Sequence, residues 1–124
     1  MKRNFIFLIL TFIILGCAKQ GNKPYILMEK QIADLNNRHR TTAKIVIGSA
    51  FSVNRENIEK TLKQALSDLQ KDDPELDAVI IWAYKDRKEL NQTFTLGKLE
   101  YSKDKRGWDG RQNFNNEIIL EVKK

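Results

Sequence analysis

The chain is poor in the residues that build cross-links and metal centres. It contains one cysteine, Cys17, and one histidine, His39, among 124 residues. A disulfide within the chain needs two cysteines, and a structural zinc site needs about four nitrogen or sulfur ligands. We therefore expect no metal and no cofactor, and we expect stability to come from packing. His39 lies in the polar stretch 36–40, where a solvated turn residue is the expected role.

Long apolar segments are also scarce. The longest run, Phe5 to Leu15, has about eleven residues, too few to span a hydrocarbon core of about 30 Å as a helix. Lys2 and Arg3 precede the run, and the small residue Gly16 follows it. A positive start, a short apolar core and a small residue at the exit are typical of a secretory signal peptide, which is removed from the mature protein.

The end of this run carries a more specific pattern. Ile14, Leu15, Gly16 and Cys17 resemble the lipobox of bacterial lipoproteins, in which an aliphatic residue, a short spacer ending in a small residue, and a cysteine mark the lipidation site. The resemblance implies cleavage between Gly16 and Cys17, a diacylglycerol on the Cys17 thiol and an acylated terminal amine. The alternatives, an uncleaved anchor or a buried core helix, leave Cys17 without a role.

The domain organisation follows from this assignment. Residues 1–16 are expected to be a cleaved signal peptide, 17–24 the lipidated cysteine with a short tether, and 25–124 one domain. A chain of this length supports one modest core but hardly two. The tether spans about 25 Å at most when extended. We therefore expect the domain to lie close to a bacterial membrane, in the cell envelope, on the extracytoplasmic side.

The charge of the chain narrows the choice of partners. The formal net charge is +6, but Lys2 and Arg3 belong to the segment that is expected to be removed. A modest positive charge on a lipid-tethered domain suits anionic headgroups or other acidic envelope polymers. An exported protein rarely meets nucleic acid, so no nucleic-acid partner is expected.

One helix is clearly predicted. An apolar stripe at helical spacing predicts a helix over residues 55–71, with Ser52 or Asn54 as its N-cap. Asp73 and Pro74 end it, since the residue before proline avoids the helical region. The members of the stripe are Ile58, Leu62, Ala65, Leu66 and Leu69.

Strands are predicted on both sides of the helix. Residues 25–35 fit either a strand or one face of a helix, and the Asn36-Asn37 turn before the β-branched run 41–47 favours a hairpin. Residues 78–84 are apolar on both faces, as expected for a central strand. Residues 118–122 alternate as an amphipathic edge strand.

Two finer predictions concern the middle of the sheet. The apolar phase changes between Phe94-Leu96 and Leu99-Tyr101, which predicts a β-bulge at Gly97-Lys98. On the central strand, side chains at even positions are expected to pack against the helix or a second layer: Ile80, Trp82 and Tyr84. Trp82 is then a core residue with its indole N–H bonded, and the alternative is a stacking platform for a ligand.

The order of elements, strand-strand-helix-strand-strand-strand, predicts an α+β fold. We expect a mostly antiparallel sheet of about five strands packed under the one helix. Segments 79–84, 95–97 and 107–108 are similar to those of a small, functionally uncharacterised family of bacterial α+β domains. That resemblance implies the fold and no activity.

The candidate binding residues lie in segment 102–116. Trp108 is surrounded there by Lys105, Arg106 and Arg111, and such a group can hold an anionic, planar or sugar-like ligand. The alternative is a solvated connection whose Trp108 folds back onto the sheet. Carboxylates at the helix end are expected to be a solvated turn: Asp72, Asp73, Glu75 and Asp77.

The catalytic motifs that can be read from sequence are missing. The chain contains no phosphate-binding loop, nucleophile elbow or Cys/His pair, so we expect no enzyme. The predicted function is a non-catalytic envelope lipoprotein whose domain binds another protein or an anionic surface component. The alternative is an inhibitor or immunity-type lipoprotein that occludes an envelope-acting enzyme or toxin.

Overall fold

The computed structural model describes residues 23–49, 52 and 54–123. The predicted signal peptide 1–16, the lipidation site Cys17 and the first part of the tether lie outside the described residues. Within those residues, no helix is long and apolar enough to cross a membrane.

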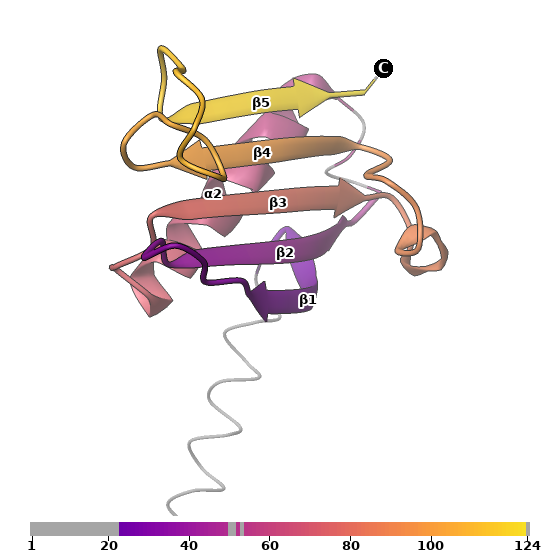
Figure 1. Cartoon of the computed structure of the whole chain (residues 1–124). Coiled ribbons are helices and arrows are strands. Elements are labelled where there is room, and N and C mark those ends of the chain that lie inside the picture. The colour runs from indigo at the N-terminus through magenta and orange to yellow at the C-terminus, as the bar shows by residue number, and fades with distance from the viewer. Residues whose placement is uncertain (1–22, 50–51, 53, 124) are drawn as a thin grey trace, which may run out of the picture.

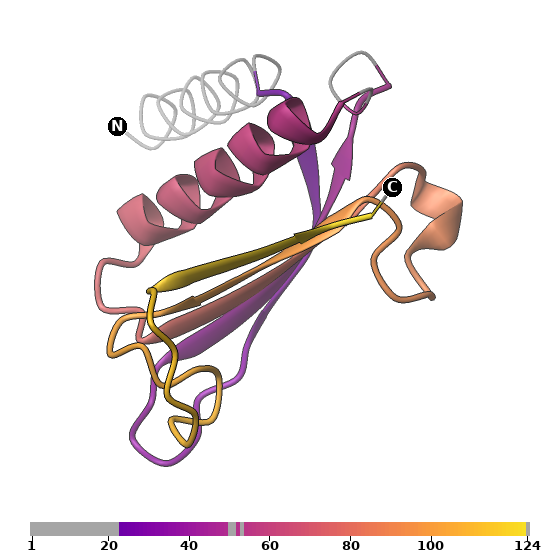
Figure 2. The same ribbon diagram turned by 90° about the horizontal axis from the view of Figure 1, so that it is seen from above.

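The described residues form one five-stranded sheet with one long helix on one of its faces (Figures 1 and 2). Strand order in the sheet follows chain order, and only the β2–β3 pair is parallel. Parallel neighbours need a crossover connection, which α2 supplies. The elements are β1 (Tyr25–Ile32), β2 (Arg40–Ile47), α2 (Arg55–Asp72), β3 (Ala78–Tyr84), the 3-10 turn η1 (Arg87–Glu89), β4 (Gly97–Ser102) and β5 (Ile118–Val122). The predicted α+β fold and its order of elements are confirmed.

The hairpin of β1 and β2 forms around the predicted turn. Asn36 and Asn37 both have positive φ, at 52° and 63°, and Leu35 and Arg38 exchange two backbone hydrogen bonds across them. Two consecutive residues of positive φ match the twist of a two-residue hairpin. Residues 25–32 are therefore a strand, and the helical alternative for this segment is excluded.

Helix α2 begins and ends close to the predicted residues. The side chain of Asn54 accepts a hydrogen bond of 2.8 Å from the backbone N–H of Asn57, so Asn54 is the N-cap. The helix ends at Asp72, followed by Asp73 and Pro74. All five residues of the predicted apolar stripe are buried.

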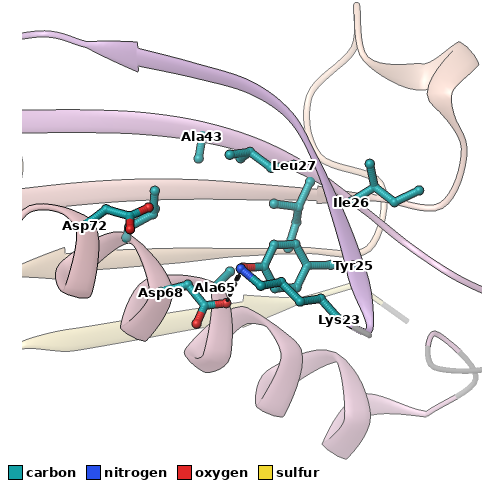
Figure 3. Close-up of a pocket in the computed structure, with 10 residues that line it drawn as sticks. Lys23, Tyr25, Ile26, Leu27, Ala43, Ala65, Asp68 and Asp72 are labelled. Carbon is teal, nitrogen blue, oxygen red and sulfur yellow. Dashed lines mark hydrogen bonds and ion pairs between the residues drawn. The ribbon is translucent and has the colours of Figure 1, made fainter. Parts of the chain in front are cut away.

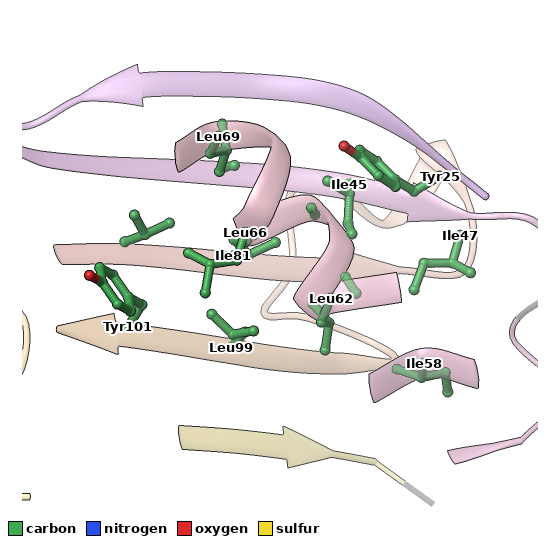
Figure 4. Packing of buried hydrophobic residues seen from close by; sticks show 14 of the residues in the cluster. Tyr25, Ile45, Ile47, Ile58, Leu62, Leu66, Leu69, Ile81, Leu99 and Tyr101 are labelled. Atoms are coloured by element: carbon green, nitrogen blue, oxygen red, sulfur yellow. The ribbon is translucent and has the colours of Figure 1, made fainter. Parts of the chain in front are cut away.

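The core lies between α2 and one face of the sheet (Figure 4). Leu62, Ile81 and Leu99 are fully buried there, with no exposed area. Other buried members of the same cluster are Ile45, Ile47, Ile58, Leu66, Leu69, Val79, Ala83 and Tyr101.

The predicted packing of β3 against the helix is wrong for Ile80, Trp82 and Tyr84. Tyr84 is fully buried but lies outside the cluster under α2, and its hydroxyl donates to the carbonyl oxygen of Gln92 at 2.7 Å. Val79, Ile81 and Ala83 belong to the cluster under α2, whereas Ile80 and Trp82 are partly exposed on the opposite face. Successive side chains of a strand point to opposite faces, and a strand that is apolar on both faces does not show which face the helix covers.

The predicted bulge at Gly97-Lys98 is also wrong. Strand β4 begins at Gly97 and pairs with β3 in unbroken register, so Phe94 and Leu96 precede the strand. The change in the apolar alternation instead marks the boundary between the loop after β3 and the start of β4. Gly97 is needed there because an added Cβ would lie 2.8 Å from the carbonyl oxygen of Glu121 on β5. The register of the sheet does shift in β1, between Leu27 and Glu29.

Candidate functional site

The candidate site lies on the open face, which is the face of the sheet opposite α2. In Figure 1 this face points toward the viewer and α2 passes behind the strands. The loop after β3, residues 85–96, stands at one end of the open face, and the loop between β4 and β5, residues 103–117, stands at the other. The sheet thus supplies a rigid floor with a loop at each end.

Strand pairing arranges the side chains of the open face in rows. Residues paired across neighbouring strands share a row, and successive rows are two residues apart, or about 6.6 Å. The first row is Gln31, Thr42, Ile80 and Glu100, and the second is Glu29, Lys44, Trp82 and Lys98. The register therefore places polar and aromatic side chains from separate strands side by side.

A pocket of about 360 Å³ lies over these rows. Known ligand pockets are commonly about 300–1,000 Å³, so this one is large enough for a small group. Trp82 of β3 lies one row beyond Thr42 and Ile80, and the ring of Trp108, from the 103–117 loop, lies against Arg40, which is one row before them. The full lining is Glu29, Gln31, Thr42, Ala43, Lys44, Ile80, Trp82 and Trp108.

The Trp108 side of the pocket is held in place by Arg40 and Glu100. The guanidinium carbon of Arg40 lies 4.4 Å from the centroid of the Trp108 ring, in a cation–π contact. Arg40 Nη1 also donates to the carbonyl oxygen of Trp108 at 3.2 Å, and the backbone N–H of Trp108 donates to Glu100 Oε1 at 3.3 Å. The indole is therefore oriented before any ligand binds.

Trp82 forms the other side of the pocket. Its ring meets Phe94 edge-on, with centroids 5.9 Å apart, and Lys44 Nζ lies 6.0 Å from its centroid. Within the described part of the chain, Trp82 Nε1 is shielded from solvent and has no hydrogen-bond partner. The predicted bonded indole N–H is thus wrong. Leaving a buried donor without a hydrogen bond costs about 1–3 kcal/mol of stability. Such a donor is unusual in a residue that only fills the core.

The lining of the pocket carries no net charge. Its two charged side chains, Lys44 and Glu29, form an ion pair of 3.2 Å. Lys44 Nζ also donates to the carbonyl oxygen of Leu90 at 2.8 Å. The pair therefore neutralises itself and ties β1 and β2 to the 85–96 loop.

The four binding residues predicted from the sequence do not form one site. Trp108 folds back onto the sheet, as the alternative interpretation expected, and there it lines the pocket. Arg106 and Arg111 line a separate shallow hollow in their own loop, and Lys105 lines another beside Lys63. The pocket residues of β1 and β2 were missed, although their signal was present: alternate positions of those strands are polar.

The 103–117 loop is tied to the β1–β2 loop by Arg38. Arg38 Nη1 donates to Asp104 at 2.8 Å and Nη2 donates to the carbonyl oxygen of Gly107 at 2.8 Å. The Gly107 N–H in turn donates to Ser102 Oγ at 3.0 Å, and Gly107 has a φ of 78°. These contacts hold the loop that carries Trp108.

His39 is not the solvated turn residue that the sequence predicted. Its ring nitrogens are bonded to Asp34, at 2.7 Å, and to Asp73. Its backbone N–H donates to Asp77 at 2.8 Å, so Asp73 and Asp77 are also not a merely solvated turn. These bonds join the β1–β2 loop to the connection between α2 and β3. The hydrogen bond that His39 donates to Asp73, followed by the one it donates to Asp34, raises the pKa of His39.

This raised pKa predicts a pH-dependent contribution of His39 to stability. Charged His39 stabilises the folded state fully below the unfolded pKa of about 6.5, and the contribution is lost as pH rises through the higher folded pKa. We expect His39→Gln to destabilise the protein more at about pH 5.5 than at about pH 9. Chemical denaturation at both pH values measures the difference, and NMR gives the folded pKa. Asp34→Asn should lower that pKa; a His39 midpoint at or below about 6.5 would contradict the prediction.

A second pocket, of about 410 Å³, lies between β1 and α2 (Figure 3). The Tyr25 hydroxyl donates to Asp68 at 2.5 Å, and Lys23 Nζ lies 3.4 Å from the same carboxylate. Burial and then this hydrogen bond raise the pKa of Tyr25, which stays a neutral donor. Tyr25 and Lys23 thus attach the start of β1 to the helix through Asp68.

The described residues contain no cluster of three or more histidine, cysteine, aspartate or glutamate side chains that could hold a metal ion. The open-face pocket likewise has no histidine or cysteine in its lining. Its chemistry consists of two indoles, a hydroxyl, an amide and a paired lysine and glutamate. This set is suited to binding.

Comparison with known proteins places the fold but assigns no activity. Residues 22–123 match a family model described as "Domain of unknown function (DUF4875)". A crystal structure of a DUF487 family protein from Desulfovibrio piger has a similar fold, with a TM-score of 0.64 and 13% sequence identity. The similarity covers 81% of this chain and 62% of that one. No curated protein matches the chain.

Proposed function

For a chain that belongs to the family described as a domain of unknown function (DUF4875), we propose a binding role without catalysis. The protein is a bacterial envelope lipoprotein, anchored through Cys17 on the extracytoplasmic side of a membrane. Its domain captures a component of the envelope in the open-face pocket between Trp82 and Trp108.

The anchoring part of the proposal rests on the first seventeen residues. A short apolar run follows two basic residues and ends in a lipobox-like sequence at Gly16-Cys17. A lipid chain contributes about 0.8 kcal/mol per buried methylene, and two or more chains give stable anchoring. The lone cysteine of the chain is the residue that this modification needs.

The binding part of the proposal rests on one observation: two tryptophans from distant segments line the same pocket on the open face. Trp82 and Trp108 are only partly buried there, and one of them is fixed by Arg40. Tryptophan is one of the residue types enriched among the side chains that contribute most to binding.

The same residues argue against a catalytic role for the pocket. A general acid or base must have a proton-accepting or proton-donating group free to reach the substrate. The titratable side chains in the lining are Lys44 and Glu29, which are paired with each other. The pocket therefore offers contact surface and hydrogen bonds.

Photo-crosslinking in living cells tests the binding role. We expect p-benzoylphenylalanine at Lys98, which faces the open side beside Trp82, to form a specific adduct with an envelope component. The same probe at Lys60, exposed on α2, serves as the control and should not form this adduct. Adding Trp108→Ala should abolish the Lys98 adduct. Equal labelling from both positions, or an adduct insensitive to Trp108, would count against the open face.

A further inference from the structure

Building on the proposed binding function, we infer the class of ligand. We propose that the open-face pocket binds an uncharged saccharide ring of an envelope glycan, held between Trp82 and Trp108 over the floor of Thr42 and Ile80. The inference rests on the shape, the hydrogen-bonding groups and the charge of the pocket.

The first argument is the match between two amphipathic surfaces. A saccharide ring presents C–H groups on its faces and hydroxyl groups around its rim. Trp82 and Trp108 supply apolar ring surface on either side of one row of the sheet, and Ile80 adds an apolar patch between them. Indole rings combine a large apolar area with little loss of conformational freedom on binding.

The second argument concerns the polar side chains that share the lining. Gln31 offers amide donors and an acceptor, Thr42 a hydroxyl that does both, and the Glu29–Lys44 pair adds acceptors and donors. A saccharide hydroxyl also donates and accepts at the same time. Rim hydroxyls can therefore be satisfied from four different side chains.

The third argument is the absence of net charge in the pocket. Lys44 and Glu29 cancel, and Arg40 lies beneath Trp108 with 6% exposure, so it does not line the pocket. Arg40 Nε and Nη1 already donate to Ala33 and Trp108. An anionic ligand would lose water around its charge and find no free cation among the lining residues to compensate. An uncharged ligand does not carry this desolvation cost.

The position of the pocket favours a glycan over an extended peptide. A peptide gains most of its affinity at a sheet by pairing with a free strand edge. The floor residues Thr42 and Ile80 belong to β2 and β3, which have a neighbouring strand on both sides. A ligand here meets side chains alone, which suits a ring that stacks.

Fluorescence titration tests the proposal on the full lipidated protein in detergent micelles, because both indoles line the pocket. The probes are N-acetylglucosamine oligosaccharides, built from one of the two sugars of peptidoglycan strands, uncharged hexose oligosaccharides, as found in surface polysaccharides, and polygalacturonate as an anionic polymer. We expect saturable binding of one of the two uncharged probes, and which one binds identifies the source of the glycan. Polygalacturonate should bind more weakly.

Substitutions place the binding in the pocket. Trp108→Ala should weaken it about tenfold or more, as expected for an aromatic anchor. Gln31→Ala should weaken it about three- to tenfold without affecting folding, because Gln31 is exposed on the edge strand. Lys60→Ala on α2 is the control and should change nothing.

The outcomes separate this proposal from the proposed function. Three outcomes would overturn the proposal of an uncharged saccharide ligand: preferred binding of polygalacturonate, no binding of either uncharged probe, or binding insensitive to both pocket substitutions. If the Lys98 crosslink still captures a peptide or protein, the binding role stands and only the ligand class is wrong. If that crosslink also fails, both proposals fall.

Discussion

Replacing Leu62 with alanine is expected to lower the free energy of unfolding by about 2–5 kcal/mol. Leu62 is fully buried in the centre of the interface between α2 and the sheet (Figure 4). The substitution removes buried apolar surface and leaves a cavity that a close-packed core fills only in part. Domains of this size have a total stability of about 5–15 kcal/mol, so much of it depends on this one side chain.

Urea unfolding followed by circular dichroism measures this effect. Leu35→Ala is the matched control, because it makes the same chemical change at a side chain that is 54% exposed. The control should stay within about 0.5 kcal/mol of the unsubstituted protein. A loss below about 1 kcal/mol for Leu62→Ala would mean that α2 does not cover the core as described.

Replacing Cys17 with serine is expected to abolish both lipidation and signal-peptide cleavage. A hydroxyl cannot replace the thiol that takes the diacylglycerol, and the resemblance to lipoproteins implies that cleavage follows this modification. The variant should therefore keep its N-terminal segment and incorporate no acyl chain. Metabolic labelling with an alkyne fatty acid, together with mass spectrometry of the intact protein, measures both changes.

Gly16→Ala provides the control for this experiment. It alters the other side of the same bond but keeps a small residue before the cysteine, so labelling and cleavage should continue. An unmodified Cys17 in the mature protein, or fatty-acid label in Cys17→Ser, would show that the lipoprotein assignment is wrong.

Local signals in the sequence were sufficient for most of the elements. The stripe from Ile58 to Leu69 predicted α2 because apolar residues recur at helical spacing and a cap precedes them. The Asn36-Asn37 pair predicted the hairpin because few residues tolerate positive φ twice in succession. Both signals depend on neighbours in the chain, so no tertiary information was needed.

Contacts between distant segments account for what the sequence did not predict. His39 meets Asp73 across 34 positions of the chain, so its neighbours in sequence give no sign of the bond. Trp108 contacts Arg40 and shares a pocket with Trp82, while Arg106 and Arg111, its near neighbours, point to another hollow. Residues adjacent in a loop have no fixed common direction, so clustering in sequence did not predict clustering in space.

By itself, the sequence determined the α+β class of this protein, the order of its strands and helix, and the position of a single helical stripe. These features follow from periodicity, capping and turn residues, which act over a few positions. Only the tertiary structure decided which face of β3 the helix covers, and hence that Trp82 lies on the open face with Trp108. Alternation divides a strand into two faces, but packing against α2 selects the one that is buried, because the helix can cover only one side of the sheet.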